Sequence, residues 1–141
     1  MKKQILIIPI VIIVICIVII KINKEENDYY SYLQNNNYYL LTSKLDDKEI
    51  DKIINVKEYE IEDINIYKSS LLLECNFYIY VESDNIDKIK IYLDTYFEEK
   101  YNNNPRLLAN YNKRYYVDNN DKLYYFVGAD SKEAYNLIKK M

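Results

Sequence analysis

The hydrophobic positions of this 141-residue chain are concentrated at its start. Residues 5–20 form an unbroken apolar run of 16, between a basic leader (residues 1–4) and Lys21. As a helix, residues 5–22 would extend about 27 Å, close to the thickness of a bilayer's hydrocarbon core. An isolated strand in lipid would leave its backbone groups without hydrogen-bond partners. The pattern therefore predicts a transmembrane signal anchor over residues 5–22, followed by a polar hinge over residues 23–28.

Three other interpretations of the apolar run remain open. A cleaved secretory signal would end in small residues, whereas residues 18–21 read Val-Ile-Ile-Lys. A lipoprotein signal would place a small residue before the modified cysteine, but Cys16 follows Ile15. A buried, water-soluble helix would carry polar residues on one face. An uncleaved anchor in the lipid bilayer fits the pattern better than these three.

The positive charges that flank the run predict its orientation. Lys2, Lys3 and the terminal amine precede it, and Lys21 and Lys24 follow it. This bias places the leader in the cytoplasm and the rest of the chain outside the cell membrane. We take Lys2, Lys3 and Lys21 as the residues that flank the membrane.

Residues 29–55 are expected to form a helical segment. Apolar residues have roughly helical spacing over residues 29–45, but three asparagines at 35–37 interrupt it, so we expect a broken helix or a helix followed by a turn there. Asp46 and Glu49 form a capping-box pattern, which predicts a short helix at about residues 47–55.

Beyond residue 56 the apolar period changes to two, which is typical of strands. Strands are expected at 59–67, with a bulge near Asp63, and at 71–81. A helix with Ile86, Ile89, Leu93, Tyr96 and Phe97 on one face follows, and residues 102–105 (Asn-Asn-Asn-Pro) end it. Further strands at 107–117 and 123–127 are joined by a turn at 118–121, and a capping box at Asp130 and Glu133 begins a last helix.

This order predicts an α+β extracytoplasmic domain over residues 56–141. We expect a two-layer sandwich of helices on a four-stranded antiparallel sheet, a permuted ferredoxin-like arrangement. The 107–117 strand would form one edge and the 59–67 strand the other. The alternative is two ββα units side by side.

The composition excludes several kinds of site. There is no His or Trp, and there are only one Gly and two Cys, so His-based triads, His-ligated zinc, Cys-cluster metal sites and glycine-rich phosphate loops are excluded. Cys75 alternates inward on a predicted strand and should be an inert core thiol. Tyrosine is abundant, at 18 residues, but Ile, Asn and Lys are enriched with it, as an A/T-rich gene would produce. We predict no catalytic residues, no metal and no cofactor.

Charge changes sign along the chain. Residues 25–63 carry net −7 and residues 105–141 carry net +3. The basic residues near the end could meet an anionic envelope polymer, a lipid headgroup or an acidic protein surface, or form only a solvated face. These residues are Arg106, Lys113, Arg114, Lys139 and Lys140.

Other groupings have plainer interpretations. Residues 110–116 mix tyrosines with cations, but the strand signature of RNA-recognition domains is missing, so no nucleic acid is expected. We interpret Glu58, Glu60 and Glu62 as the solvent-exposed face of an edge strand.

The sequence predicts a single-pass membrane protein with a non-catalytic interaction or sensing domain, whose partner is another envelope protein or an anionic envelope polymer. A membrane-tethered hydrolase or ligand-binding domain that uses surface carboxylates and tyrosines is the alternative. A third possibility is an accessory subunit with the apolar helix itself as its contact surface.

Overall fold

The computed structural model describes residues 29–71 and 75–141; the predicted leader, anchor and hinge lie outside the described residues. The chain divides into two compact units, Met1–Asn36 and Asn37–Met141. In the first unit, residues 29–35 are helical. Among the helices that the structure describes, none has the length and apolar character needed to cross a membrane.

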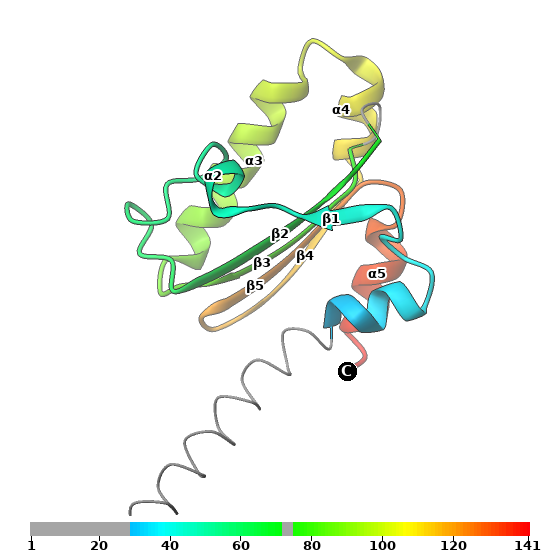
Figure 1. Cartoon of the computed structure of the whole chain (residues 1–141), viewed down its shortest axis with the longest axis horizontal. Helices are drawn as coiled ribbons and strands as arrows, with labels where there is room; N and C mark the ends of the chain where they lie inside the picture. Colours follow the sequence, from blue (N-terminus) through cyan, green and yellow to red (C-terminus); the bar gives the residue numbers. More distant parts are fainter. Residues whose placement is uncertain (1–28, 72–74) are drawn as a thin grey trace, which may run out of the picture. The chain divides into compact units, whose positions relative to one another are not determined.

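The second unit is an α+β domain with a five-stranded antiparallel sheet (Figure 1). The strands lie in the order β1-β2-β3-β5-β4, and each neighbouring pair is antiparallel. The elements, in chain order, are β1 (Thr42–Lys44), α2 (Asp47–Ile50), β2 (Asp63–Ser69), β3 (Phe77–Glu82), α3 (Ile86–Tyr101), α4 (Pro105–Tyr111), β4 (Arg114–Asn119), β5 (Lys122–Val127) and α5 (Ser131–Ile138).

The expected order of the four longer strands is confirmed, and β4 forms the expected edge. The prediction of four strands is wrong, because β1 pairs with β2 and takes the other edge. Leu45 N extends this pairing by donating to Ile66 O at 2.8 Å. A strand of three residues, Thr-Ser-Lys, carries no apolar alternation, so the pattern could not reveal it inside the predicted helical segment 29–55.

One face of the sheet carries the main hydrophobic core. Phe77, Ile79 and Val81 of β3 project from this face and are buried. Leu93 and Phe97 of α3 pack against it, and the rings of Phe77 and Phe97 lie 4.9 Å apart. The predicted buried stripe of α3 is confirmed at Ile86, Ile89, Leu93 and Phe97, whereas Tyr96 is half-buried.

The opposite face carries aromatic side chains and is covered in part by α5. Tyr78 and Phe126 project there, with their rings 5.6 Å apart. Tyr115 of β4 stacks on Tyr135 of α5 at 5.4 Å. Figure 1 shows α3 and α5 on opposite sides of the sheet. The prediction of a two-layer sandwich is therefore wrong: β3 is apolar on both faces, and each face needs a cover.

The predicted strand 107–117 is wrong over its first half. Residues Pro105–Tyr111 form α4, and only Arg114–Asn119 form β4. Asn104 caps α4 by accepting a hydrogen bond from Leu107 N at 3.2 Å, and Pro105 occupies the first helical turn, where it costs no backbone hydrogen bond. These start signals outweigh a short alternation of apolar residues.

The capping box of Asp46 and Glu49 is confirmed, but α2 ends at Ile50 rather than Asn55. The turns that follow extend to residue 60, so β2 begins at Asp63 and not at residue 59. Glu60 has a φ of 50°, a left-handed conformation that ends any strand. The prediction that Glu58, Glu60 and Glu62 line one strand face is therefore wrong.

Two further details differ from expectation. β3 begins at Phe77 rather than residue 71, although Cys75 is buried as predicted. The second capping box does not form at α5. The Asp130 carboxylate instead accepts hydrogen bonds from Tyr39 N at 2.9 Å and from Asn76 Nδ2 at 3.4 Å. The Asp130 side chain therefore makes tertiary hydrogen bonds and does not cap α5 as the local pattern predicted.

Candidate functional site

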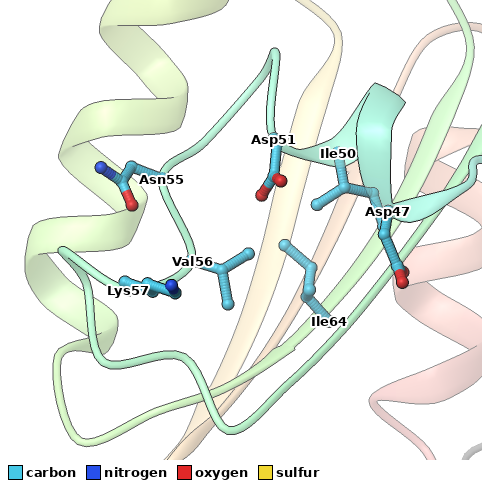
Figure 2. Close-up of a pocket in the computed structure, with 7 residues that line it drawn as sticks. All are labelled: Asp47, Ile50, Asp51, Asn55, Val56, Lys57 and Ile64. Carbon is cyan, nitrogen blue, oxygen red and sulfur yellow. The ribbon is translucent and has the colours of Figure 1, made fainter.

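A groove beside α2 is the candidate site. It has a volume of about 570 Å³ and is lined by α2, by the turns that follow α2, and by one residue of β2. Figure 2 shows Ile50, Val56 and Ile64 turned toward one another on its floor, with the Asp51 carboxylate directed into the same space. The complete lining is Asp47, Ile50, Asp51, Asn55, Val56, Lys57 and Ile64.

Hydrogen bonds fix both walls of the groove. Asp46 Oδ1 accepts a hydrogen bond from Glu49 N at 2.9 Å, and Glu49 Oε2 accepts one from Asp46 N at 3.0 Å. This capping box fixes the start of α2. On the other wall, Asn55 Oδ1 accepts from Glu58 N at 3.2 Å and shapes the turn. The Tyr92 hydroxyl of α3 donates to Ile53 O at 2.6 Å and ties this turn to the helix. These hydrogen bonds hold both walls of the groove in place within the folded domain.

The groove lies on the most acidic part of the domain. Residues 46–63 contain eight acidic and three basic side chains, which gives net −5. The ion pairs found among the described residues involve none of these acids. Asp47 and Asp51 are four residues apart, a spacing at which like charges repel. On the groove itself, Asp47 and Asp51 outnumber Lys57, so its rim is weakly acidic within an acidic stretch and favours a cation, while its floor favours an apolar side chain.

A second hollow of about 580 Å³ is lined by residues 58–60 of the same turns, by α3 and by Asn85 just before it. The rings of Tyr59 and Tyr92 form its aromatic wall, with centroids 5.1 Å apart. Burial raises the pKa of Tyr92, and Tyr59 and Glu58 raise it further. Glu60 Oε2 accepts from Asn85 Nδ2 at 2.9 Å. The acidic turns thus border two hollows.

A partly buried polar cluster surrounds Asp94 on α3. Asp94 Oδ1 accepts from the Tyr125 hydroxyl at 2.6 Å, from Arg114 Nε at 2.9 Å and from the Tyr111 hydroxyl at 3.2 Å. Arg114 Nη2 also contacts Glu98 Oε1 at 3.3 Å, and its guanidinium stacks 4.5 Å from the Tyr111 ring centroid. Both tyrosine hydroxyls and Arg114 Nε and Nη2 find acceptors within this cluster.

The tyrosines of this cluster stay protonated. Burial raises the pKa of Tyr125 above its ordinary value, and the hydrogen bond to Asp94 raises it further. Burial likewise raises the pKa of Tyr111. The two hydroxyls can therefore donate hydrogen bonds but cannot act as bases near neutral pH. No sequence pattern had marked Asp94, which borders the apolar stripe of α3 as an ordinary surface acid would.

The five basic residues predicted to meet an anionic partner lie on different parts of the domain. Arg114 points to the face covered by α3, where Asp94 and Glu98 neutralise it. Lys139 follows α5, which covers the opposite face, and its Nζ donates to the Tyr135 hydroxyl at 3.0 Å. Arg106, Lys113 and Lys140 are exposed. Binding of an anion by these residues stays a prediction.

The predicted membrane-flanking residues Lys2, Lys3 and Lys21 lie outside the described residues, so their role stays a prediction. Over residues 29–71 and 75–141, no group of three or more His, Cys, Asp or Glu side chains could hold a metal ion. Comparisons of the chain with protein-family models, with curated proteins and with solved structures give no match.

Proposed function

We propose that this chain is a single-pass membrane protein that displays a small, non-catalytic interaction domain outside the cell. The apolar run of residues 5–22 and the lysines around it support the anchor and its orientation. The compact unit Asn37–Met141, which follows a short first unit, supports a domain with its own core.

The groove beside α2 is the observation that carries the interaction role. Its apolar floor, and its rim of Asp47, Asp51 and Lys57 within a stretch of net −5 (residues 46–63), complement a segment that has both apolar and basic side chains. This chemistry favours another envelope protein over an anionic polymer as the partner. The proposed ligand is a basic, partly apolar peptide segment of such a protein.

Binding of a defined peptide tests this function. The full-length chain is placed in bilayer discs of neutral phosphatidylcholine and titrated with a fluorescent peptide of alternating Leu and Lys, with empty discs as the blank. We expect saturable binding that weakens as salt is raised. The double variant Asp47→Lys/Asp51→Lys should weaken binding by about tenfold or more, because rim attraction becomes repulsion.

The control variant carries the same change of net charge away from the groove. Asp87→Lys/Asp121→Lys replaces two exposed acids, one on α3 and one in the β4–β5 loop. Binding by this control should stay within about twofold of the parent. Equal loss of binding in both double variants, or no saturable binding by the parent, would refute the role of the groove.

A further inference from the structure

Among the described residues, no strand pairs with the outer side of β4, which leaves one row of its backbone groups without a neighbouring strand. Lys113 O accepts from Gly128 N at 3.0 Å, and the pairing with β5 runs to Asn119 opposite Lys122. Because backbone bonds alternate along an antiparallel pair, the odd-numbered residues bond to β5. Arg114, Tyr116 and Asp118 therefore direct their N–H and C=O groups away from the sheet.

We propose that this edge is the surface on which a second copy of the chain docks, joining two sheets through antiparallel β4 strands. A two-fold axis at Tyr116 would place Arg114 of each copy opposite Asp118 of the other, and Tyr116 opposite its own counterpart. On the other face, Tyr115 would lie opposite Val117. The edge is self-complementary in this register, in charge and in apolar character.

The alternation of backbone bonds selects this register. Pairing across the new interface requires outward-facing residues to meet one another. With the axis at Tyr116, all three of them do: Arg114 with Asp118, Tyr116 with Tyr116, and Asp118 with Arg114. Moving the axis to Tyr115 or Val117 pairs only two outward residues of β4 in each copy and leaves the charges unmatched.

The charged side chains already stand in place on this edge. Arg114 contacts Asp94 and Glu98 through Nε and Nη2, which leaves Nη1 for a second carboxylate. Asp118 Oδ2 contacts Lys90 Nζ at 3.3 Å, which leaves Oδ1. Tyr116 lies between them, 44% exposed, with Lys90 at 4.4 Å from its ring centroid. Docking would need no rearrangement of these contacts.

Disulfide trapping tests the proposal on the full-length chain in detergent micelles. Cys16→Ser removes the thiol of the apolar run, and Cys75 stays because it is buried. In this background, Tyr116→Cys would place two cysteines about 5.5 Å apart between Cα atoms, within disulfide range. Mild oxidation should then give a disulfide dimer on non-reducing gels.

The matched control is Asn119→Cys, on the same strand and also exposed. In the proposed register its two copies lie about 20 Å apart along the strands. We expect the dimer fraction of Tyr116→Cys to exceed that of Asn119→Cys by about fivefold or more, since only the former pair meets the distance limit. Equal fractions in the two variants would overturn the proposal.

A charge variant tests the pairing independently. Adding Asp118→Lys to Tyr116→Cys would place the new lysine of each copy opposite Arg114 of the other, so the dimer fraction should fall to that of the control. Asp121→Lys makes the same charge change in the neighbouring loop and should leave the fraction unchanged. Circular dichroism of each variant verifies the fold. A folded Asp118→Lys variant that still dimerises fully would also overturn the proposal.

Discussion

Asp94 Oδ1 accepts hydrogen bonds from two buried tyrosines and from Arg114. Without this carboxylate the buried Tyr125 hydroxyl would lose its hydrogen bond of 2.6 Å, whereas Tyr111 would keep its bond to the Asp94 backbone carbonyl at 3.0 Å; buried hydroxyls are costly to leave unpaired. The side chain of Asp94 is itself 35% exposed, so water moderates its attraction to Arg114. The cluster therefore stabilises the junction of α3, α4 and the sheet mainly through hydrogen bonds.

Asp94→Asn should lower the free energy of unfolding by about 1–3 kcal/mol, because an amide is a weaker acceptor and adds donors where donors already converge. Urea unfolding of the full-length chain in detergent, followed by circular dichroism, measures the loss. Glu98→Gln is the control and should cost less than about 1 kcal/mol, since it touches only an exposed ion pair. Equal losses would show that Asp94 has no special role.

Cys75 links stability to alkaline pH. Burial raises the pKa of its thiol from 9.0 to about 11, so folding favours the neutral form. Below pH 9 both states keep the proton and the linkage adds nothing. Between pH 9 and 11 the unfolded chain loses the proton first, and the folded state is destabilised.

The thiol should account for a loss of about 2 kcal/mol between pH 8 and pH 10.5, from a pKa difference of two units. The loss caused by the thiol is the difference between the parent and Cys75→Ala, because the tyrosines are present in both proteins. Urea unfolding at the two pH values measures it. A loss of the same size in both proteins would contradict the buried thiol.

At the scale of elements, the sequence predicted most where local signals and burial agree. The 3.6-residue stripe of α3 and the capping box of Asp46 and Glu49 both appear in the structure. The order of the four longer strands could also be predicted from the sequence, because two hairpins and the connection through α3 constrain it.

The elements that the sequence missed depend on contacts distant along the chain. β1 exists because it pairs with β2, and the Asp130 carboxylate turns from its predicted cap to Tyr39 N, 91 residues away. The groove was missed for the same reason: Ile64 of β2 meets Ile50 and Val56 only after folding. Only its acidity was visible beforehand, in the charge of residues 25–63.

The start of α4 gives a test at this scale. Asn104→Ala removes the acceptor for Leu107 N and should cost about 1 kcal/mol of stability. Asn103→Ala, one residue earlier in the exposed turn, should change stability by less than about 0.5 kcal/mol. Chemical unfolding of both variants measures the difference. Equal effects would mean that the cap does not hold α4.

At the scale of the whole molecule, the proposed protein combines an anchor inferred from the sequence with a domain whose surface is unevenly charged. The acidic turns after α2 border two hollows, and residues 105–141 carry a net positive charge. A domain held outside a membrane would present both regions to other envelope components. The proposed function therefore depends on which side of the membrane the domain lies.

Labelling of one introduced cysteine tests that claim most directly. Asn119→Cys in the Cys16→Ser background carries an exposed thiol, while Cys75 is buried. Intact cells are treated with a membrane-impermeant maleimide, and their membranes are then washed with alkaline carbonate. The account predicts a labelled chain that stays in the membrane pellet. Labelling only after the cells are permeabilised, or a labelled chain released into the wash, would contradict it.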